Sequence, residues 1–105
     1  MKTITVRDSE DNPYTLTFTA KSVMELEHRG FDPNHYDTEP VSMTILFVEG
    51  ALKAKHPNAT QDKAIEILEL IDDKEGFIQA LTEIYTDVME NLMVNKGKKK
   101  WEANF

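Results

Sequence analysis

The sequence predicts an α+β domain that is mostly α, with an N-terminal β-hairpin followed by about four helices and a disordered basic C-terminal arm. Three observations support this fold class. Apolar and polar residues alternate, as in strands, only within the first 18 residues. Every later apolar pattern has the helical period. After residue 93 the apolar period ends and lysines dominate.

The length and the charge distribution separate a body from an arm. A chain of 105 residues suits one hydrophobic core, so we expect a single domain over residues 1–93 and the arm over residues 94–105. The body carries 8 Lys/Arg against 18 Asp/Glu, whereas the arm carries 4 against 1. Because nucleic-acid phosphates and anionic lipids bind basic surfaces, the body is expected to bind neither nucleic acid nor membrane.

Cysteine is absent from the chain. Disulfides, thiolate metal sites and a cysteine nucleophile are thereby excluded, and a reducing compartment is indicated. The sequence runs from its first residues directly into a strand pattern, and no apolar stretch is long enough for a signal peptide or a membrane span. We therefore expect a cytoplasmic protein.

The hairpin is expected within residues 2–18, with a polar turn over residues 8–13. In each strand the alternation places a set of apolar side chains on one face: Ile4 and Val6 in the first strand, and Tyr14, Leu16 and Phe18 in the second.

The first helix is expected at about residues 20–29. Thr19 is a suitable N-cap, and Gly30 followed by Phe31 indicates a Schellman ending. A surface loop should follow, because the next segment contains Asp32-Pro33-Asn34.

The second helix is expected at about residues 40–55, with Pro40 in its first turn. It carries two apolar stripes on nearly opposite faces: Val41, Ile45, Val48 and Leu52 on one, and Met43, Phe47, Ala51 and Ala54 on the other. A helix that is apolar on two faces must be covered on both, so we expect this helix to be the central helix of the domain. The alternative is that one stripe forms a groove for a partner.

The third and fourth helices are expected at about residues 60–72 and 73–93. Thr60 is a suitable N-cap for the third helix. Asp72 and Glu75 resemble a capping box at the start of the fourth.

The apolar side chains of the fourth helix cover an arc of roughly 180°, wider than a simple surface helix needs. We expect this helix to contact two neighbours. A second copy of the chain is one candidate, which would make the protein a homo-oligomer, with Tyr85, Met89 and Met93 at the outer edge of the arc. The alternative is a monomer whose arc is covered by the hairpin and the second helix.

No catalytic or ligand-binding motif is evident. His28, His35 and His56 lie far apart, and none has the spacing of metal ligands on one helix face. The segment His35-Tyr36-Asp37 indicates a hydrogen-bonded loop rather than an acid/base pair, and the scattered glycines form no phosphate-binding loop. We expect no catalytic residue, no cofactor and no metal site, and therefore no enzyme.

The arm is the remaining candidate for a binding function. Lysine runs are commonly solvated and disordered, and Lys98, Lys99 and Lys100 fit that description. Trp101 and Phe105 add two large apolar side chains, which suit a segment that folds on binding in a partner's groove. We therefore expect these five residues, with those of the fourth helix, to contact a partner.

Several segments occur in a particular order: Phe18-Thr19-Ala20-Lys21-Ser22-Val23-Met24-Glu25-Leu26-Glu27, Gly30-Phe31, Gly50-Ala51, Tyr85 followed after six residues by Leu92-Met93, and Lys100-Trp101-Glu102. This order resembles the small tail assembly chaperones of long-tailed (siphovirus-type) phages and prophages of Gram-positive bacteria. The resemblance extends over most of the chain and rests on pattern rather than on a catalytic motif.

The resemblance implies a non-enzymatic protein of the host bacterial cytoplasm. It would bind the tape-measure protein and keep it soluble during tail-tube polymerisation, with the tail-tube protein as a further partner. The alternative from composition is an acidic inhibitor or antitoxin-like module that blocks a basic nucleic-acid-binding site on a partner protein. An inhibitor of that kind needs carboxylates arranged along one exposed surface, whereas a chaperone needs an exposed apolar groove.

Overall fold

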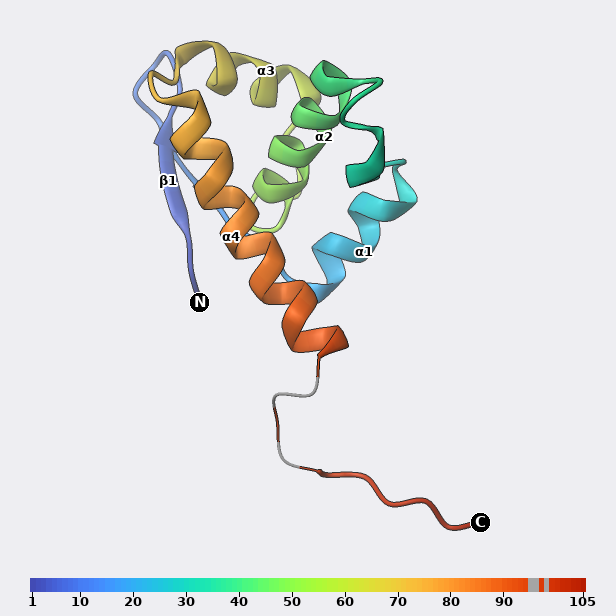
Figure 1. Ribbon diagram of the computed structural model, residues 1–105. Helices are drawn as coiled ribbons and strands as arrows, with labels where there is room; N and C mark the ends of the chain where they lie inside the picture. The colour runs from blue at the N-terminus through green and yellow to red at the C-terminus, as the bar shows by residue number, and fades with distance from the viewer. Residues whose placement is uncertain (95–96, 98) are drawn as a thin grey trace.

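The computed structural model describes residues 1–94, 97 and 99–105 (Figure 1). In this part of the chain, a two-stranded antiparallel hairpin precedes four α-helices, which confirms the predicted α+β, mostly α class. The elements are β1 (Ile4–Arg7), β2 (Pro13–Leu16), α1 (Ala20–His28), the short 3₁₀ helix η1 (Pro33–His35), α2 (Pro40–Lys53), α3 (Gln61–Leu70) and α4 (Lys74–Met93). The described residues of the arm form neither helix nor strand, and its disorder stays a prediction.

Local capping signals set both ends of α1. The Thr19 hydroxyl accepts a hydrogen bond from the Ser22 N–H, and the Ser22 hydroxyl accepts one from the Thr19 N–H, forming a capping box. At the other end Gly30 has φ +96°, and the Phe31 N–H donates to the Leu26 carbonyl. The predicted Schellman ending is confirmed.

The later helices also begin at side-chain caps, with one correction. Thr60 caps α3 as predicted, by accepting the Lys63 N–H at 3.2 Å. The predicted capping box of Asp72 is wrong, because Asp73 caps α4 and accepts the Gly76 N–H at 3.0 Å. A Cβ atom at Gly76 would collide with this carboxylate, so glycine leaves room for the cap.

The hairpin register places its apolar side chains together and connects its outer edge to α2. Ile4 lies opposite Leu16, and Val6 lies opposite Tyr14. On the outer edge of β2, the Thr17 N–H donates to the Ala51 carbonyl at 3.2 Å, and the Thr15 N–H donates to Nε2 of His56 at 3.0 Å. A two-stranded sheet is only marginally stable by itself, so these bonds to α2 and to the segment that follows it hold it in place.

Helix α2 is the central helix, as predicted. Seven of its residues are buried: Met43, Phe47, Val48, Glu49, Gly50, Ala51 and Leu52. The first half of one predicted stripe is an exception, since Val41 is 70% exposed and Ile45 is only half-buried. The expectation that this whole stripe is covered is therefore wrong at its N-terminal end, because no element of the described chain covers the start of α2 there.

An aromatic cluster brings four segments together in the core. The Phe47 ring of α2 lies 5.0 Å from Phe18, which follows β2, and 5.2 Å from Phe31, which follows α1. Tyr85 of α4 packs edge-on against all three rings, with centroid distances of 5.4–5.9 Å. Edge-on packing of this kind is the arrangement that aromatic quadrupoles favour.

Two substitutions in α2 test the burial pattern. Val48→Asp should abolish cooperative folding, because an unpaired buried charge costs several kcal/mol, comparable to the stability of a small domain. Val41→Asp, two turns earlier on the same predicted stripe, should change the free energy of unfolding by less than about 1 kcal/mol. Thermal unfolding followed by circular dichroism measures both. A folded Val48→Asp variant, or an unfolded Val41→Asp variant, would contradict this placement of α2.

Candidate functional site

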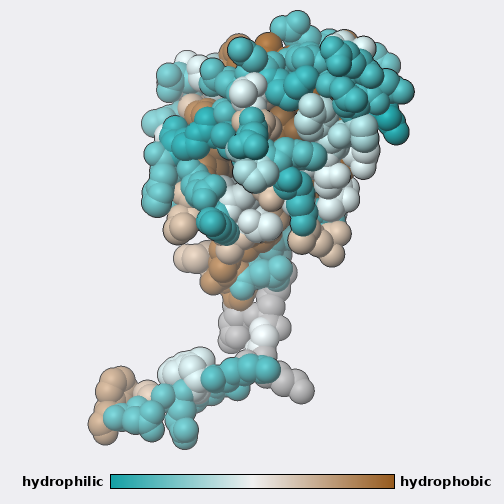
Figure 2. Space-filling model, turned by 180° about the vertical axis from the view of Figure 1, so that it is seen from behind, coloured by the Kyte–Doolittle hydropathy of each residue, from teal (hydrophilic) through white to brown (hydrophobic). Residues whose placement is uncertain are grey.

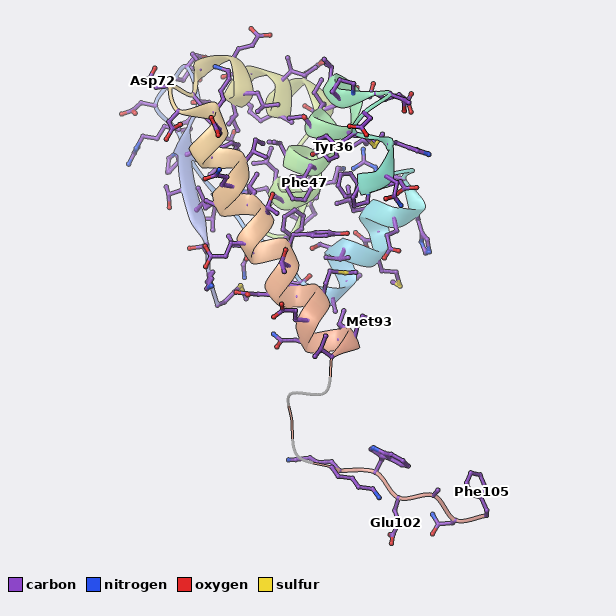
Figure 3. The ribbon with its side chains drawn as sticks, viewed as in Figure 1. Tyr36, Phe47, Asp72, Met93, Glu102 and Phe105 are labelled. Atoms are coloured by element: carbon purple, nitrogen blue, oxygen red, sulfur yellow. The ribbon has the colours of Figure 1, made fainter. Side chains whose placement is uncertain are left out.

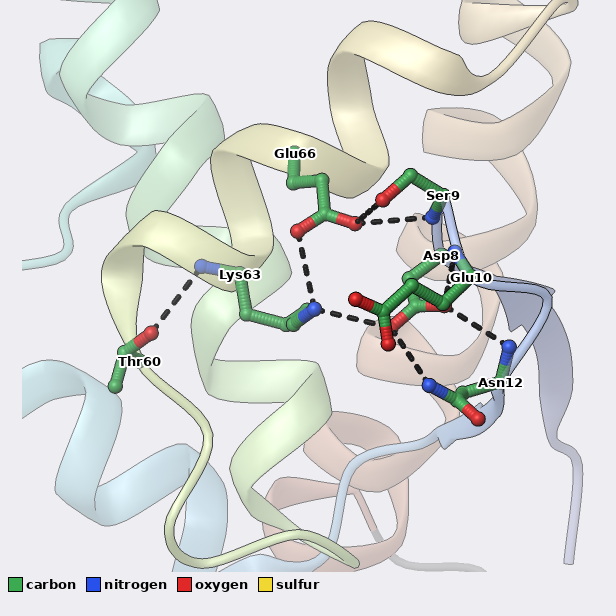
Figure 4. Close-up of polar contacts among 7 residues, drawn as sticks. All are labelled: Asp8, Ser9, Glu10, Asn12, Thr60, Lys63 and Glu66. Carbon is green, nitrogen blue, oxygen red and sulfur yellow. Dashed lines mark hydrogen bonds and ion pairs between the residues drawn. The ribbon is translucent and has the colours of Figure 1, made fainter.

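A polar cluster joins the hairpin turn to α3 (Figure 4). The Lys63 Nζ lies 3.0 Å from Oδ2 of Asp8 and 3.0 Å from Oε1 of Glu66. The other Glu66 oxygen accepts both the N–H and the hydroxyl of Ser9, each at 3.0 Å. We refer to Asp8, Ser9, Lys63 and Glu66 as the turn cluster.

The protonation states of the turn cluster follow from these contacts. Hydrogen bonds from the Asn12 N–H, Lys63 and the Glu10 N–H lower the pKa of Asp8 from 3.8 to about 2. The Ser9 N–H and Lys63 lower the pKa of Glu66, and the two carboxylates raise the pKa of Lys63. All three groups are thus charged at neutral pH and bonded to one another, which indicates a structural role rather than a proton transfer.

The histidines have separate environments. His56 uses Nε2 to accept the Thr15 N–H, and its ring packs edge-on against Tyr14. His35 lies 3.7 Å from the Asp32 carboxylate, whereas its neighbour Tyr36 packs against the Phe31 ring. Among the described residues, no group of three or more His, Cys, Asp or Glu side chains could hold a metal ion.

Other carboxylates of the body also face cations of the same chain. Glu49, whose side chain is only 4% exposed, pairs with Arg29 at 2.6 Å and joins α2 to the end of α1. Lys2 lies 2.8 Å from Glu83 and 2.7 Å from Asp87, which fastens the N-terminus to α4. These pairs connect segments that lie far apart in the sequence.

Exposed apolar side chains are concentrated in the C-terminal part of the chain. Leu92 and Met93 end α4, Val94 follows it, and all three are exposed, Met93 by 78%. Trp101 and Phe105 follow on the arm and are also exposed. We call these five residues the C-terminal pole. Figure 2 shows apolar surface at this end of the body and again at the end of the arm, and Figure 3 shows Met93 at the last turn of α4.

The predicted binding residues of α4 separate in the structure. Met93 is exposed, but Met89 is half-buried against the core. Tyr85 does not lie at the outer edge of the arc, because its ring belongs to the aromatic cluster. Leu92 was not predicted as a binding residue, and nothing in the local pattern distinguishes it from a buried position of the same helix.

The predicted residues of the arm lie apart from the body (Figure 1). The Lys99 Nζ lies over the Trp101 ring, 4.7 Å from its centroid, as a cation–π contact within the arm. Lys100 and Phe105 are exposed. Lys98 lies outside the described residues.

A second apolar surface lies between α2 and α3. Val41 and Ile45 of α2 face Ile65 and Leu68 of α3 across an open hollow of about 420 Å³. Its remaining lining residues are Pro40, Thr44, Glu69 and Lys74. We call this hollow the α2–α3 groove. It coincides with the uncovered start of the stripe for which the sequence left a partner groove as an alternative.

Comparisons with known proteins give one match. The family model described as Domain of unknown function (DUF5055) matches residues 1–105. No curated protein and no solved structure matches the chain. Within the described residues, no helix is long and apolar enough to cross a membrane.

The turn cluster predicts an acid dependence of stability. Because the folded state lowers the pKa of Asp8 to about 2 from 3.8, the stabilisation by its carboxylate is complete above about pH 4 and is lost as the pH falls toward 2. Asp8→Asn should lower the free energy of unfolding at pH 7, and its difference from the unchanged protein should shrink over that window. Urea unfolding between pH 2 and pH 7 measures the difference.

The control is Glu10→Gln, an exposed carboxylate of the same turn. It should leave the free energy of unfolding almost unchanged between pH 4 and pH 7. A difference between the Asp8→Asn variant and the unchanged protein that stays constant down to pH 2 would contradict the role given to Asp8.

Proposed function

The chain belongs to the DUF5055 family, whose description assigns no function, and we propose that it is a tail assembly chaperone of a long-tailed phage or prophage. In this proposal the protein binds the tape-measure protein and keeps it soluble while tail-tube subunits polymerise, in the host bacterial cytoplasm. It acts by binding alone, without a catalytic residue or cofactor. The proposal starts from the resemblance of the sequence to these chaperones.

The C-terminal pole is the observation that carries the proposal. Of the nine large apolar side chains that are exposed in the described part of the chain, five lie in residues 92–105. Single exposed apolar residues are normal on a protein surface, but Leu92, Met93 and Val94 are consecutive and together form an apolar surface that suits contact with another molecule. A long aggregation-prone partner would gain protection where its apolar segments contact this pole.

The chemistry of the pole suits a partner with many different segments. Methionine is unbranched and flexible, so Met93, with Met89 beside it, can adapt to apolar surfaces of varied shape. The body behind the pole is strongly acidic, and the formal net charge of the whole chain is −7. Net charge of this size opposes aggregation of the resulting complex.

The acidic inhibitor receives less support from the geometry. Asp8, Glu49, Glu66, Glu83 and Asp87 all pair with cations of the chain itself. Carboxylates engaged in this way are poor substitutes for the free phosphates of a nucleic acid. We therefore propose the chaperone function alone.

Co-expression tests the proposal. The probe is the tape-measure protein encoded in the same gene cluster, and the measured quantity is its fraction in the soluble part of the lysate. We expect the chain to raise this fraction and the double variant Leu92→Glu/Met93→Glu to lose most of the gain, because charges at the pole prevent apolar contact. Pull-down with the tail-tube protein tests the second partner.

The control variant is Leu70→Glu. Leu70 is also an exposed leucine, but it ends α3 close to the start of α4, about 30 Å from the pole by the length of that helix. The Leu70→Glu variant should keep the tape-measure protein as soluble as the unchanged chain does. A tape-measure protein that is equally soluble with the double variant, or with no chaperone at all, would overturn the proposal.

A further inference from the structure

We propose that, in the free protein, the C-terminal arm of one copy binds in the α2–α3 groove of a second copy, so that the chain associates head to tail. This inference goes beyond the chaperone function, because it concerns contacts between copies and requires no tape-measure protein. Three features carry it: the apolar lining of the groove, the composition of the arm and the distance between them.

The groove offers an apolar surface that the chain itself leaves open. Val41 and Ile45 form one wall, and Ile65 and Leu68 form the other. Val41 is 70% exposed although it begins a stripe that is fully buried two turns later. A volume of about 420 Å³ accommodates a large aromatic side chain, which would remove this surface from water.

The arm carries apolar side chains and positive charge, which complement the apolar lining of the groove and the acidic body. Trp101 and Phe105 are its large apolar residues, and Trp101 is 69% exposed with Lys99 over its ring. The arm carries 4 Lys/Arg against 1 Asp/Glu, and the body carries 8 against 18, so the two attract each other. At the groove, Glu69 is a lining residue and the exposed Glu39 directly precedes Pro40.

One lining residue has the same charge as the arm. Lys74 borders the groove at the start of α4. Its Nζ donates to the Ile71 carbonyl at 2.7 Å, which holds the ammonium group at the end of α3. The arm therefore meets a rim with carboxylates and one fixed cation.

The length of the chain keeps Trp101 from the groove of the same copy. Helix α4 has 20 residues and is about 30 Å long. Lys74 at its start lines the groove, whereas the arm leaves from Val94 at its other end (Figure 1). The seven residues from Val94 to Trp101 span at most about 25 Å. Trp101 therefore falls short of its own groove, whereas Phe105, eleven residues beyond Val94, spans up to about 40 Å. We therefore assign Trp101 as the side chain that a second copy supplies.

The contact uses two different surfaces, so each bound copy still has an arm or a groove free. Such a heterologous contact continues to a closed ring or an open chain and does not stop at a symmetric dimer. Because the attraction between arm and body is partly electrostatic and exposed to solvent, added salt should weaken it.

Mixing two full-length variants tests the proposal. Val41→Asp disables the groove but keeps the arm, and Trp101→Ala/Phe105→Ala disables the arm but keeps the groove. Trp101 is the only tryptophan of the chain, so fluorescence in the mixture reports solely on the arm of the Val41→Asp copy. We expect each variant alone to be a monomer. The mixture should give a complex of two copies by sedimentation and a shift of the tryptophan emission to shorter wavelength.

The unchanged chain should form larger species as its concentration rises, and these should dissociate at high salt. The control Met24→Asp changes another exposed apolar residue, on α1, and should associate like the unchanged chain. A strictly monomeric unchanged chain would overturn the proposal. So would a Val41→Asp variant that associates normally, or association that is lost in Leu92→Glu/Met93→Glu but kept in Val41→Asp, since the end of α4 would then form the contact.

Discussion

The burial of α2 is the constraint on which the rest of the structure depends. From Phe47 to Leu52 every residue of this helix is buried, so other elements must cover it on all sides. The hairpin bonds to the Ala51 carbonyl, and α1 approaches so closely at Gly50 that a Cβ atom there would lie 2.9 Å from a methyl group of Leu26. A two-stranded sheet and a nine-residue helix are each marginal alone, so both obtain their stability from α2.

The same arrangement determines where apolar surface stays open. Helix α4 has 20 residues, whereas α1 has 9 and α3 has 10, so its last turn extends beyond the elements that could cover it. The first turns of α2 likewise extend beyond the buried run and form the wall of the α2–α3 groove. One apolar surface thus stays open at the end of α4, and another stays open between the start of α2 and α3. The proposed chaperone function uses the end of α4 and the arm, and the proposed contact between copies joins the arm to the α2–α3 groove.

The charges of the body have two different effects. Some of them form ion pairs that connect elements of the fold. Lys63 holds the hairpin turn to α3, and Arg29 neutralises the buried Glu49. Removing one partner of a buried pair would leave an uncompensated charge, which is strongly destabilising. The remaining excess of carboxylates gives the body its negative field and makes the basic arm electrostatically distinct from it.

The sequence alone determined the fold class and most helix ends, because these depend on neighbouring residues. Thr19, Gly30 and Thr60 act as predicted, since a cap or a positive φ is decided within a few residues. The sequence alone did not determine whether Asp72 or Asp73 caps α4, because both side chains offer the same carboxylate acceptor. Periodicity showed which side chains share a helix face, but not which part of that face is covered. Only the tertiary structure decided that Val41 is open, because exposure depends on where the other elements end.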